Sequence, residues 1–264
     1  MAGTPVVFVH GLWLHSDSWE AWVDRFREAG YDPQAPGWPG DGATVEETRA
    51  NPDGVAGHGI NDVVAHYSEI VQSLDAKPVL IGHSFGGLIV QRLLGNGLGA
   101  AGVAIDAAPI KGVLVLPRSA LKVASVALKS PANRSKAVSL TEDEFRFGFG
   151  NTVSDEESKE LFDRWTIPSP GKPLFEAAFA NFSPHSPARV NTSNSTRGPL
   201  LLTAGGRDNT VPASITRATL KQYRHSTAVT DLREFPDRGH SLCIDAGWGD
   251  VADAVLDWLG KQEL

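Results

Sequence analysis

The sequence predicts an α/β protein in which a mostly parallel central sheet is covered by helices on both faces. Short apolar runs alternate with segments of helical spacing up to residue 107 and again from residue 199 onward. The apolar runs are continuous, which is typical of strands buried on both faces of a parallel sheet. Between residues 108 and 198 this rhythm breaks. We therefore expect a core of residues 1–107 and 199–264, interrupted by a helical insertion of residues 108–198.

Four strands and three helices are expected before the insertion. Trp19, Trp22 and Phe26 recur at helical spacing, and Gly30 follows as a C-cap residue. Residues 36–58 contain a Pro/Gly loop and then an irregular stretch. The expected strands are 6–9, 31–35, 79–81 and 102–105, and the expected helices are 19–29, 60–74 and 85–96.

The insertion carries helical signals of its own. Thr141 and Ser154 are each followed three residues later by a glutamate, which is the capping-box pattern of a helix start. An apolar stripe at helical spacing is formed by Leu174, Phe175, Ala178, Phe179 and Phe182. After the insertion we expect strands at 199–204 and 231–235 and helices at 212–223 and 249–261.

Composition limits the classes of protein that this chain resembles. Its 264 residues carry a net charge of −7, which argues against nucleic acid or an anionic membrane as a partner. One cysteine, Cys243, allows no intrachain disulfide. The start of the chain has no basic region followed by an apolar one, and no apolar run reaches the ~18 residues of a membrane span. These features predict a cytoplasmic protein.

The most informative stretch is Gly82-His83-Ser84-Phe85-Gly86, between an expected strand and an expected helix. A serine in G-x-S-x-G at such a junction is typical of a nucleophile elbow, a tight turn that lifts the hydroxyl out of the sheet. The turn brings the flanking backbones so close that side chains at both glycine positions would collide. The stretch therefore predicts a nucleophilic serine at position 84.

Further polar residues follow other expected strands. His10 ends the first strand, Asp106 follows the strand at 102–105, Asp208 follows the strand at 199–204, and His240 comes shortly after the last strand. Ligands of parallel α/β sheets bind beyond the carboxyl ends of the strands. We therefore expect these residues and Ser84 at one edge of the sheet.

With these motifs and their order, the chain resembles a serine hydrolase of the α/β-hydrolase superfamily over nearly its whole length. The matching segments are His10-Gly11-Leu12, Gly82–Gly86, Gly205-Gly206-Arg207-Asp208 and Gly239-His240, in the order Ser, Asp, His along the chain. One departure is visible, because the antiparallel strand pair with which many members begin has no room here.

The resemblance implies a catalytic triad of Ser84, Asp208 and His240, in which the histidine is the general base and the aspartate orients it. Asp106 is the rival for the acid, since some members carry it one strand earlier. The Gly-Gly-x-Asp-x-x-Val-Pro context favours Asp208, which leaves Asp106 as a strand-end residue capping the start of the insertion.

The resemblance also implies an oxyanion hole made by the backbone N–H groups of Leu12 and Phe85, with Trp13 as the alternative to Leu12. Trp13 and His10 are candidate substrate-binding residues, although His10 is better suited to orienting the loop. His83 is expected to pack beneath or beside the nucleophile. The insertion would lie over the strand ends as a cap and, with Leu12, Trp13 and Phe85, wall an apolar pocket.

The leading interpretation is hydrolysis of a carboxylic ester or lactone of a lipophilic small molecule through an acyl-enzyme. Relatives with the same triad also catalyse C–C bond hydrolysis, perhydrolysis or hydroxynitrile cleavage, and some are small-molecule receptors without catalysis. The serine at the elbow counts against dehalogenases and epoxide hydrolases, which use an aspartate there. No histidines or cysteines stand at metal-ligand spacing, so we predict neither metal nor cofactor.

Overall fold

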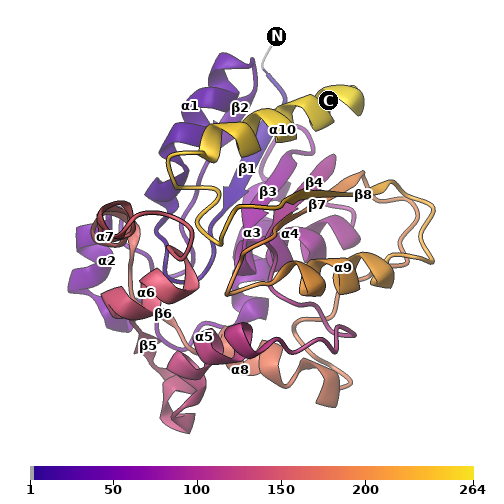
Figure 1. The fold of residues 1–264 in the computed structure, drawn as a ribbon. Coiled ribbons are helices and arrows are strands. Elements are labelled where there is room, and N and C mark those ends of the chain that lie inside the picture. Colours follow the sequence, from indigo (N-terminus) through magenta and orange to yellow (C-terminus); the bar gives the residue numbers. More distant parts are fainter. Residues whose placement is uncertain (1–2) are drawn as a thin grey trace.

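The central sheet has six parallel strands in the order β2-β1-β3-β4-β7-β8 in a computed structural model that describes residues 3–264 (Figure 1). Ile105 pairs with Thr203, and His83 pairs with Ile105, so the strand ends that carry the site line up along one edge. The bounds of the strands are β1 Pro5–Val9, β2 Asp32–Gln34, β3 Val79–His83, β4 Ala101–Ile105, β7 Leu200–Gly205 and β8 Thr230–Phe235.

Helices cover both faces of this sheet. Because side chains alternate between the two faces of a strand, the strand residues pack into two separate buried clusters. Phe8 and Ile81 pack with α1 Glu20–Glu28 and α10 Trp248–Lys261, which lie together in Figure 1. Val9 and Leu80 pack on the other face, which is covered by α3 Ile60–Gln72, α4 Phe85–Gly95 and α9 Ala213–Gln222. The predicted fold class is confirmed. No helix in the part of the chain that the structure describes combines the length and apolar character needed to cross a bilayer.

One hydrogen bond holds the loop that follows β8 against helix α1. The indole Nε1 of Trp22 on α1 donates a hydrogen bond of 2.8 Å to the carbonyl oxygen of Cys243. Trp22 is fully buried and Cys243 is 2% exposed. Since Cys243 stands three residues after His240, this bond fixes the backbone that carries the histidine.

The segment between β4 and β7 folds into helices α5 Arg118–Leu128, α6 Glu142–Gly148, α7 Asp155–Trp165 and α8 Lys172–Ala178, at the lower left and bottom of Figure 1. A short antiparallel pair, β5 Ala137–Val138 and β6 Ser169–Pro170, joins the stretch after α5 to the stretch before α8 and was not predicted. The predicted stripe is only partly helical, because α8 ends at Ala178. Phe179 and Phe182 are 59% and 85% exposed.

The two expected capping boxes differ. Thr141 forms the complete box, in which its Oγ1 accepts from the N–H of Glu144 and the Glu144 carboxylate accepts from the N–H of Thr141. Ser154 forms only half of one, because the carboxylate of Glu157 accepts from the backbone N–H of Ala246 instead. This second bond ties α7 to the loop after His240.

One local prediction was wrong. Residues 43–58 are not irregular, since they contain α2 Val45–Ala50 and a 3-10 turn at Pro52–Gly54. Thr44 caps α2 by accepting from the N–H of Glu47 at 3.2 Å, and Glu47 accepts from the N–H of Ala43 at 2.8 Å. The signal was present in the sequence as a threonine three residues before a glutamate.

Candidate active site

Ser84 lies at the junction of β3 and α4 with φ of 55° and ψ of −119°, a conformation that non-glycine residues rarely adopt. Its N–H donates to the carbonyl of Ile105 at 2.9 Å, and its carbonyl accepts from the N–H groups of Gly87 and Ala108. A Cβ on Gly82 would collide with the Gly86 backbone, and one on Gly86 would collide with that of Val9. The expected elbow geometry is therefore present and held from both sides.

His240 and Asp208 form a fully buried pair at the same edge of the sheet. The Nδ1–H of His240 donates to Oδ2 of Asp208 at 2.6 Å, and both side chains are inaccessible to solvent. The other carboxylate oxygen accepts from the N–H groups of Thr210 at 2.6 Å and Val211 at 2.8 Å. Burial alone would raise the pKa of Asp208, but the charge and hydrogen bond of His240 outweigh it and lower the pKa.

The other ring nitrogen of His240, Nε2, makes no hydrogen bond within residues 3–264. Its ring packs edge-to-face against Phe149, with centroids 4.8 Å apart, and lies 4.4 Å from the ring of His83. The Nε2–H of His83 donates to the carbonyl of His240 at 2.9 Å. Burial, reinforced by the charge of His240, lowers the pKa of His83 well below its usual value, so His83 stays neutral. The imidazole of His240 is thus oriented with Nε2 free to accept a proton.

Asp106 lies beside this pair but bonds elsewhere. Its carboxylate accepts from the N–H of Gly205 at 3.0 and 3.1 Å and not from the insertion, whose start we expected it to cap. Burial, followed by the negative charge of Asp208, raises the pKa of Asp106 well above its usual value. The geometry therefore gives His240 its carboxylate from Asp208, and leaves Asp106 as a neighbour whose uncharged form is favoured by burial.

Asp106, Asp208 and His240 also bring ligand-type atoms within 4.8 Å of one another. The hydrogen bond between Nδ1 of His240 and Oδ2 of Asp208 already occupies the two atoms that a cation would need. The chemistry of this set therefore fits an acid–base pair better than a metal centre.

The loop after β1 lies against Ser84. A Cβ on Gly11 would be 2.8 Å from Cβ of Ser84. In the described residues, the N–H groups of Leu12 and Phe85 donate to no protein acceptor, which suits the two donors expected for an oxyanion hole. The N–H of Trp13 donates to Oγ of Ser169 at 2.6 Å, so it is not available as the alternative donor.

This loop is fastened to the insertion by several bonds that the sequence did not predict. Trp13 has φ of 67°, its indole donates to the carbonyl of Val138 at 3.0 Å, and its carbonyl accepts from Ile167 at 3.1 Å. Leu14 forms an antiparallel bridge with Thr166. Because more than 120 residues separate the partners in sequence, no local pattern signals these contacts.

His10 does not line the cavity, so its placement gives no support to a substrate-binding role. It is 2% exposed, with Nδ1 at 2.9 Å from the carbonyl of Gly11 and Nε2 at 3.0 Å from Oδ2 of Asp41. Trp38 packs on its ring and donates its indole N–H to the carbonyl of His10 at 3.0 Å. These contacts suit the other expectation, that His10 orients the loop.

A cavity of about 300 Å³ opens above Ser84. Trp13 and Phe85 line it beside Ser84, whereas Leu12, which was also expected in the wall, does not. Its other walls come from α5, α8, the segment before α5 and the start of α9, and none of the lining side chains is charged. These walls are Ala108, Pro109, Ile110, Val113, Leu114, Val115, Leu116, Pro117, Ala120, Leu121, Val123, Ala124, Leu128, Leu174, Ala177, Ala178, Ala180, Asn181, Phe182, Thr210, Val211 and Ile215.

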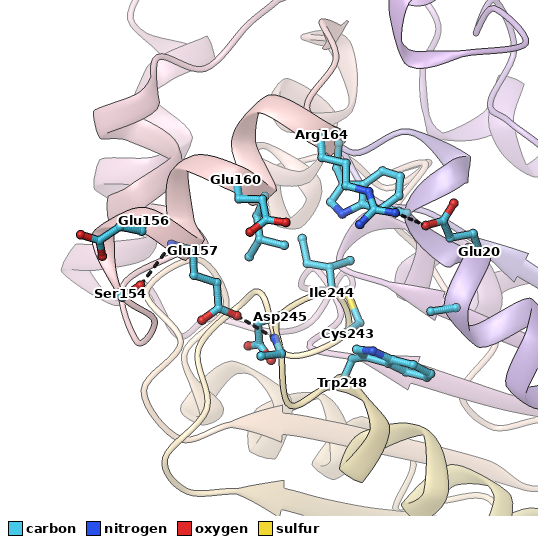
Figure 2. A pocket seen from close by; sticks show the side chains of 15 residues that line it. Glu20, Ser154, Glu156, Glu157, Glu160, Arg164, Cys243, Ile244, Asp245 and Trp248 are labelled. Atoms are coloured by element: carbon cyan, nitrogen blue, oxygen red, sulfur yellow. Dashed lines mark hydrogen bonds and ion pairs between the residues drawn. The ribbon is translucent and has the colours of Figure 1, made fainter.

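A second, larger cavity of about 530 Å³ lies between α1, α7 and the loop after His240 (Figure 2). Glu157 and Glu160 project toward it from α7, and Arg164 pairs there with Glu20 of α1. Its serines are Ser18 and Ser154, and neither lies at an elbow. No histidine lines this cavity.

The chain matches a known protein family over most of its length. Residues 6–254 match the Alpha/beta hydrolase family, so the protein belongs to that family. Family membership agrees with the six-stranded parallel sheet, the elbow and the order Ser84, Asp208, His240. No curated protein sequence matches the chain.

Several solved structures share the fold. A monoacylglycerol lipase from Paleococcus ferrophilus has a TM-score of 0.71 at 22% identity, covering 99% of this chain and 97% of the lipase. A methylesterase from Arabidopsis has a TM-score of 0.69 at 14% identity, with 97% and 99% covered. A tomato methylketone synthase in complex with 2-tridecanone has a TM-score of 0.71 at 14% identity, with 99% and 100% covered. At these identities the likeness is one of fold.

Proposed function

We propose that this protein is a serine hydrolase that cleaves a carboxylic ester or lactone of a lipophilic small molecule through an acyl-enzyme on Ser84. The observation that carries the proposal is the position of Ser84, on a strained elbow that opens into an apolar cavity beside the buried His240–Asp208 pair. A serine hydroxyl is a weak nucleophile until a neighbouring base takes its proton. His240 is the imidazole at this edge whose Nε2 makes no hydrogen bond within the described residues.

In the first half-reaction, Oγ of Ser84 attacks the ester carbonyl carbon while Nε2 of His240 takes the hydroxyl proton. The carbonyl electron pair moves onto oxygen, and the N–H groups of Leu12 and Phe85 stabilise the oxyanion. Collapse breaks the bond to the alcohol, which receives the proton from Nε2. Asp208 stabilises the imidazolium that exists in between.

In the second half-reaction, a water molecule takes the place of the alcohol. Nε2 of His240 takes a proton from the water, whose oxygen attacks the acyl carbon. Collapse releases the carboxylic acid and returns the proton to Oγ of Ser84. For a lactone, the alcohol and the acid are two ends of one product.

The insertion supports a lipophilic substrate. Its residues make most of the cavity wall, so we propose that residues 108–198 cap the site. With no charged side chain in the wall, burial of apolar surface supplies the binding energy. The names of several neighbours in the fold, a lipase and a methylesterase, agree with ester hydrolysis as the general class.

A panel of p-nitrophenyl esters of increasing acyl length tests the proposal, run on the wild type and on Ser84→Ala. We expect wild-type hydrolysis at least about 10⁴-fold faster than that of the variant, because the nucleophile is lost. Wild-type rates no higher than those of Ser84→Ala on every ester would contradict the proposal and favour a receptor or another triad chemistry.

A further inference from the structure

One segment beside the mouth of the cavity carries basic residues and no acidic ones. Between Asp106 and Glu142 the sequence contains no aspartate or glutamate, although the chain as a whole carries −7. The same segment contains six basic residues: Lys111, Arg118, Lys122, Lys129, Arg134 and Lys136. All of the net negative charge therefore lies outside this segment.

Most of these basic side chains are available to a partner, although the Lys122 ammonium lies 3.7 Å from the centroid of the Phe147 ring. Five of the six are exposed, and within residues 3–264 none of the six makes an ion pair. Lys111 is half-buried and donates instead to the carbonyl of Ser183. Elsewhere on the surface, Arg25, Arg217 and Arg164 are each paired with an acid. Exposed basic residues without an acidic partner among the described residues also occur there, such as Lys221 and Arg224. The segment thus presents uncompensated positive charge.

Large exposed apolar side chains are concentrated in the same place. Six of the seven in the described chain belong to the insertion, and five of those six line the cavity: Leu114, Val115, Leu116, Leu121 and Phe182. Leu114 and Leu116 are 75% and 73% exposed, and Phe182 is 85% exposed. Soluble proteins rarely expose such a group of apolar side chains without a binding role.

Helix α5 carries both properties on one face. Arg118, Leu121, Lys122 and Lys129 recur at helical spacing and are all exposed. The opposite side, with Val123, Val126 and Ala127, is buried. Leu114 and Leu116 precede this helix directly, and α8, whose far end leads to Phe182, contacts it at the bottom of Figure 1. We call the exposed residues 114–122 and 129, together with Phe182, the basic apolar rim.

We propose that the basic apolar rim docks the protein on a lipid surface that carries anionic headgroups. The leucines and Phe182 would enter the boundary between headgroups and acyl chains, while Arg118, Lys122 and Lys129 would lie among the headgroup phosphates. The charge is complementary to such a surface and opposite in sign to the rest of the molecule, so one orientation is favoured. In that orientation, the mouth of the cavity faces the lipid.

This inference reverses the expectation drawn from net charge for one face of the protein. A net charge of −7 predicts repulsion from an anionic membrane only if the charge is spread evenly. Within a Debye length of the surface, about 8 Å at physiological salt, the local charge of the rim is what the lipid senses. Docking does not depend on the reaction at Ser84, and it is tested without it.

Vesicle sedimentation tests the proposal, with neutral phosphatidylcholine vesicles compared with vesicles that also contain phosphatidylserine. The measurements use Ser84→Ala as the background, so that hydrolysis plays no part. One variant combines Lys122→Glu with Lys129→Glu, and a second combines Leu114→Ser with Leu116→Ser. The matched control combines Lys221→Glu with Arg224→Glu, two exposed basic residues at the end of α9. Circular dichroism melting verifies that each variant is folded.

We expect binding to the anionic vesicles, weakened by added salt, and little binding to the neutral ones. The charge reversal on α5 should reduce binding at least about tenfold, whereas the control reversal should leave it within about twofold. The leucine variant should also bind more weakly. The proposal is overturned if Ser84→Ala without further substitutions binds neither kind of vesicle. It is also overturned if both charge reversals weaken binding equally. It is also overturned if the leucine variant converts a dimer to a monomer in sedimentation velocity while no vesicle binding occurs, because the rim would then be an interface between copies.

Discussion

The two cavities of this protein differ in size and in chemistry, and the smaller one is the better candidate for catalysis. The cavity at Ser84 measures about 300 Å³ and has no charged side chain in its wall. The cavity between α1 and α7 measures about 530 Å³, and its wall includes Glu20, Glu157 and Glu160 (Figure 2). The larger space contains serines, yet neither is placed on a strained turn beside a histidine.

The difference teaches that volume and the presence of a serine do not identify a site. Three of the four described non-glycine residues with positive φ are Trp13, Ser84 and Asp106. Trp13 and Ser84 line the smaller cavity, and Asp106 lies beside the His240–Asp208 pair. Backbone strain of this kind persists only where the surrounding structure enforces it. The carboxylates of the larger cavity are largely explained by pairing, since Glu20 pairs with Arg164 and Glu157 accepts from Ala246.

The largest expected effect concerns the two aspartates beside His240. We expect Asp208→Asn to lower kcat roughly 10³- to 10⁴-fold, because the amide cannot hold the histidine in the required tautomer. Asp106→Asn should lower it less than about tenfold, since burial already favours the uncharged form of Asp106 and an amide oxygen can still accept from Gly205. Steady-state kinetics on one ester compares the two. A greater loss in Asp106→Asn would show that the acid is assigned to the wrong residue.

The shape of the smaller cavity should determine the length of the acyl chain that is accepted. Ala124 lines it on α5, so we expect Ala124→Phe to lower kcat/KM for long-chain esters about tenfold and to spare acetyl esters. Ala21→Phe, which fills the larger cavity instead, is the matched control and should alter neither. Equal effects of the two variants on the chain-length profile would break the distinction between the cavities.

A smaller effect on kcat is expected where the loop after β1 contacts the insertion. Ser169→Ala removes the acceptor of the Trp13 N–H and leaves that buried donor unpaired. We expect kcat to fall about tenfold with a smaller change in KM, because donors that act in the transition state are displaced. Ser169→Thr should restore most of the rate. Ser158→Ala is the control, since the Ser158 hydroxyl is buried without a partner in the described chain; a similar loss of kcat there would indicate general destabilisation of the insertion.

The smallest effect is a pH dependence of stability. The folded-state pKa of Asp106 is raised, so the folded protein holds a proton that the unfolded chain releases, and stability falls as pH rises between the two values. Asp106→Asn lacks this titrating carboxyl. The melting temperature of the variant minus that of the wild type should therefore increase as pH rises from about 4. For Asp208 the pKa is lowered, so its contribution is present above the unfolded value and lost as pH falls. A melting-temperature difference for Asp106→Asn that stays constant with pH would show that Asp106 titrates normally.

Much of the core and of the candidate site could be predicted because the signals are local. The elbow is a contiguous pentapeptide, and Asp208 and His240 come shortly after the expected strands at 199–204 and 231–235. Since parallel strands place their carboxyl ends at one edge, these residues had to converge once the strands were identified. The helix α2 was missed although its cap, Thr44 with Glu47, follows the same pattern that located α6.

The contacts that were not predictable join distant parts of the chain. The bond from Trp13 to Ser169 and the pairing of β5 with β6 arise from how the insertion folds back over the core. Two-residue strands have no periodicity to detect. The spacing from Leu174 to Phe182 predicts one helix face, but the chain turns at Phe179 and exposes the rings of Phe179 and Phe182. A helical pattern does not reveal which partner covers it.

The most direct test of the central claim is covalent labelling with a fluorophosphonate, followed by peptide mapping in a mass spectrometer. A fluorophosphonate reacts with a serine that a neighbouring base has activated, whatever the natural substrate is. Our account predicts one adduct, on Ser84, which is absent in Ser84→Ala and unchanged in Ser154→Ala, the matched serine of the larger cavity. An adduct on another residue, or equal labelling of the wild type and Ser84→Ala, would contradict it.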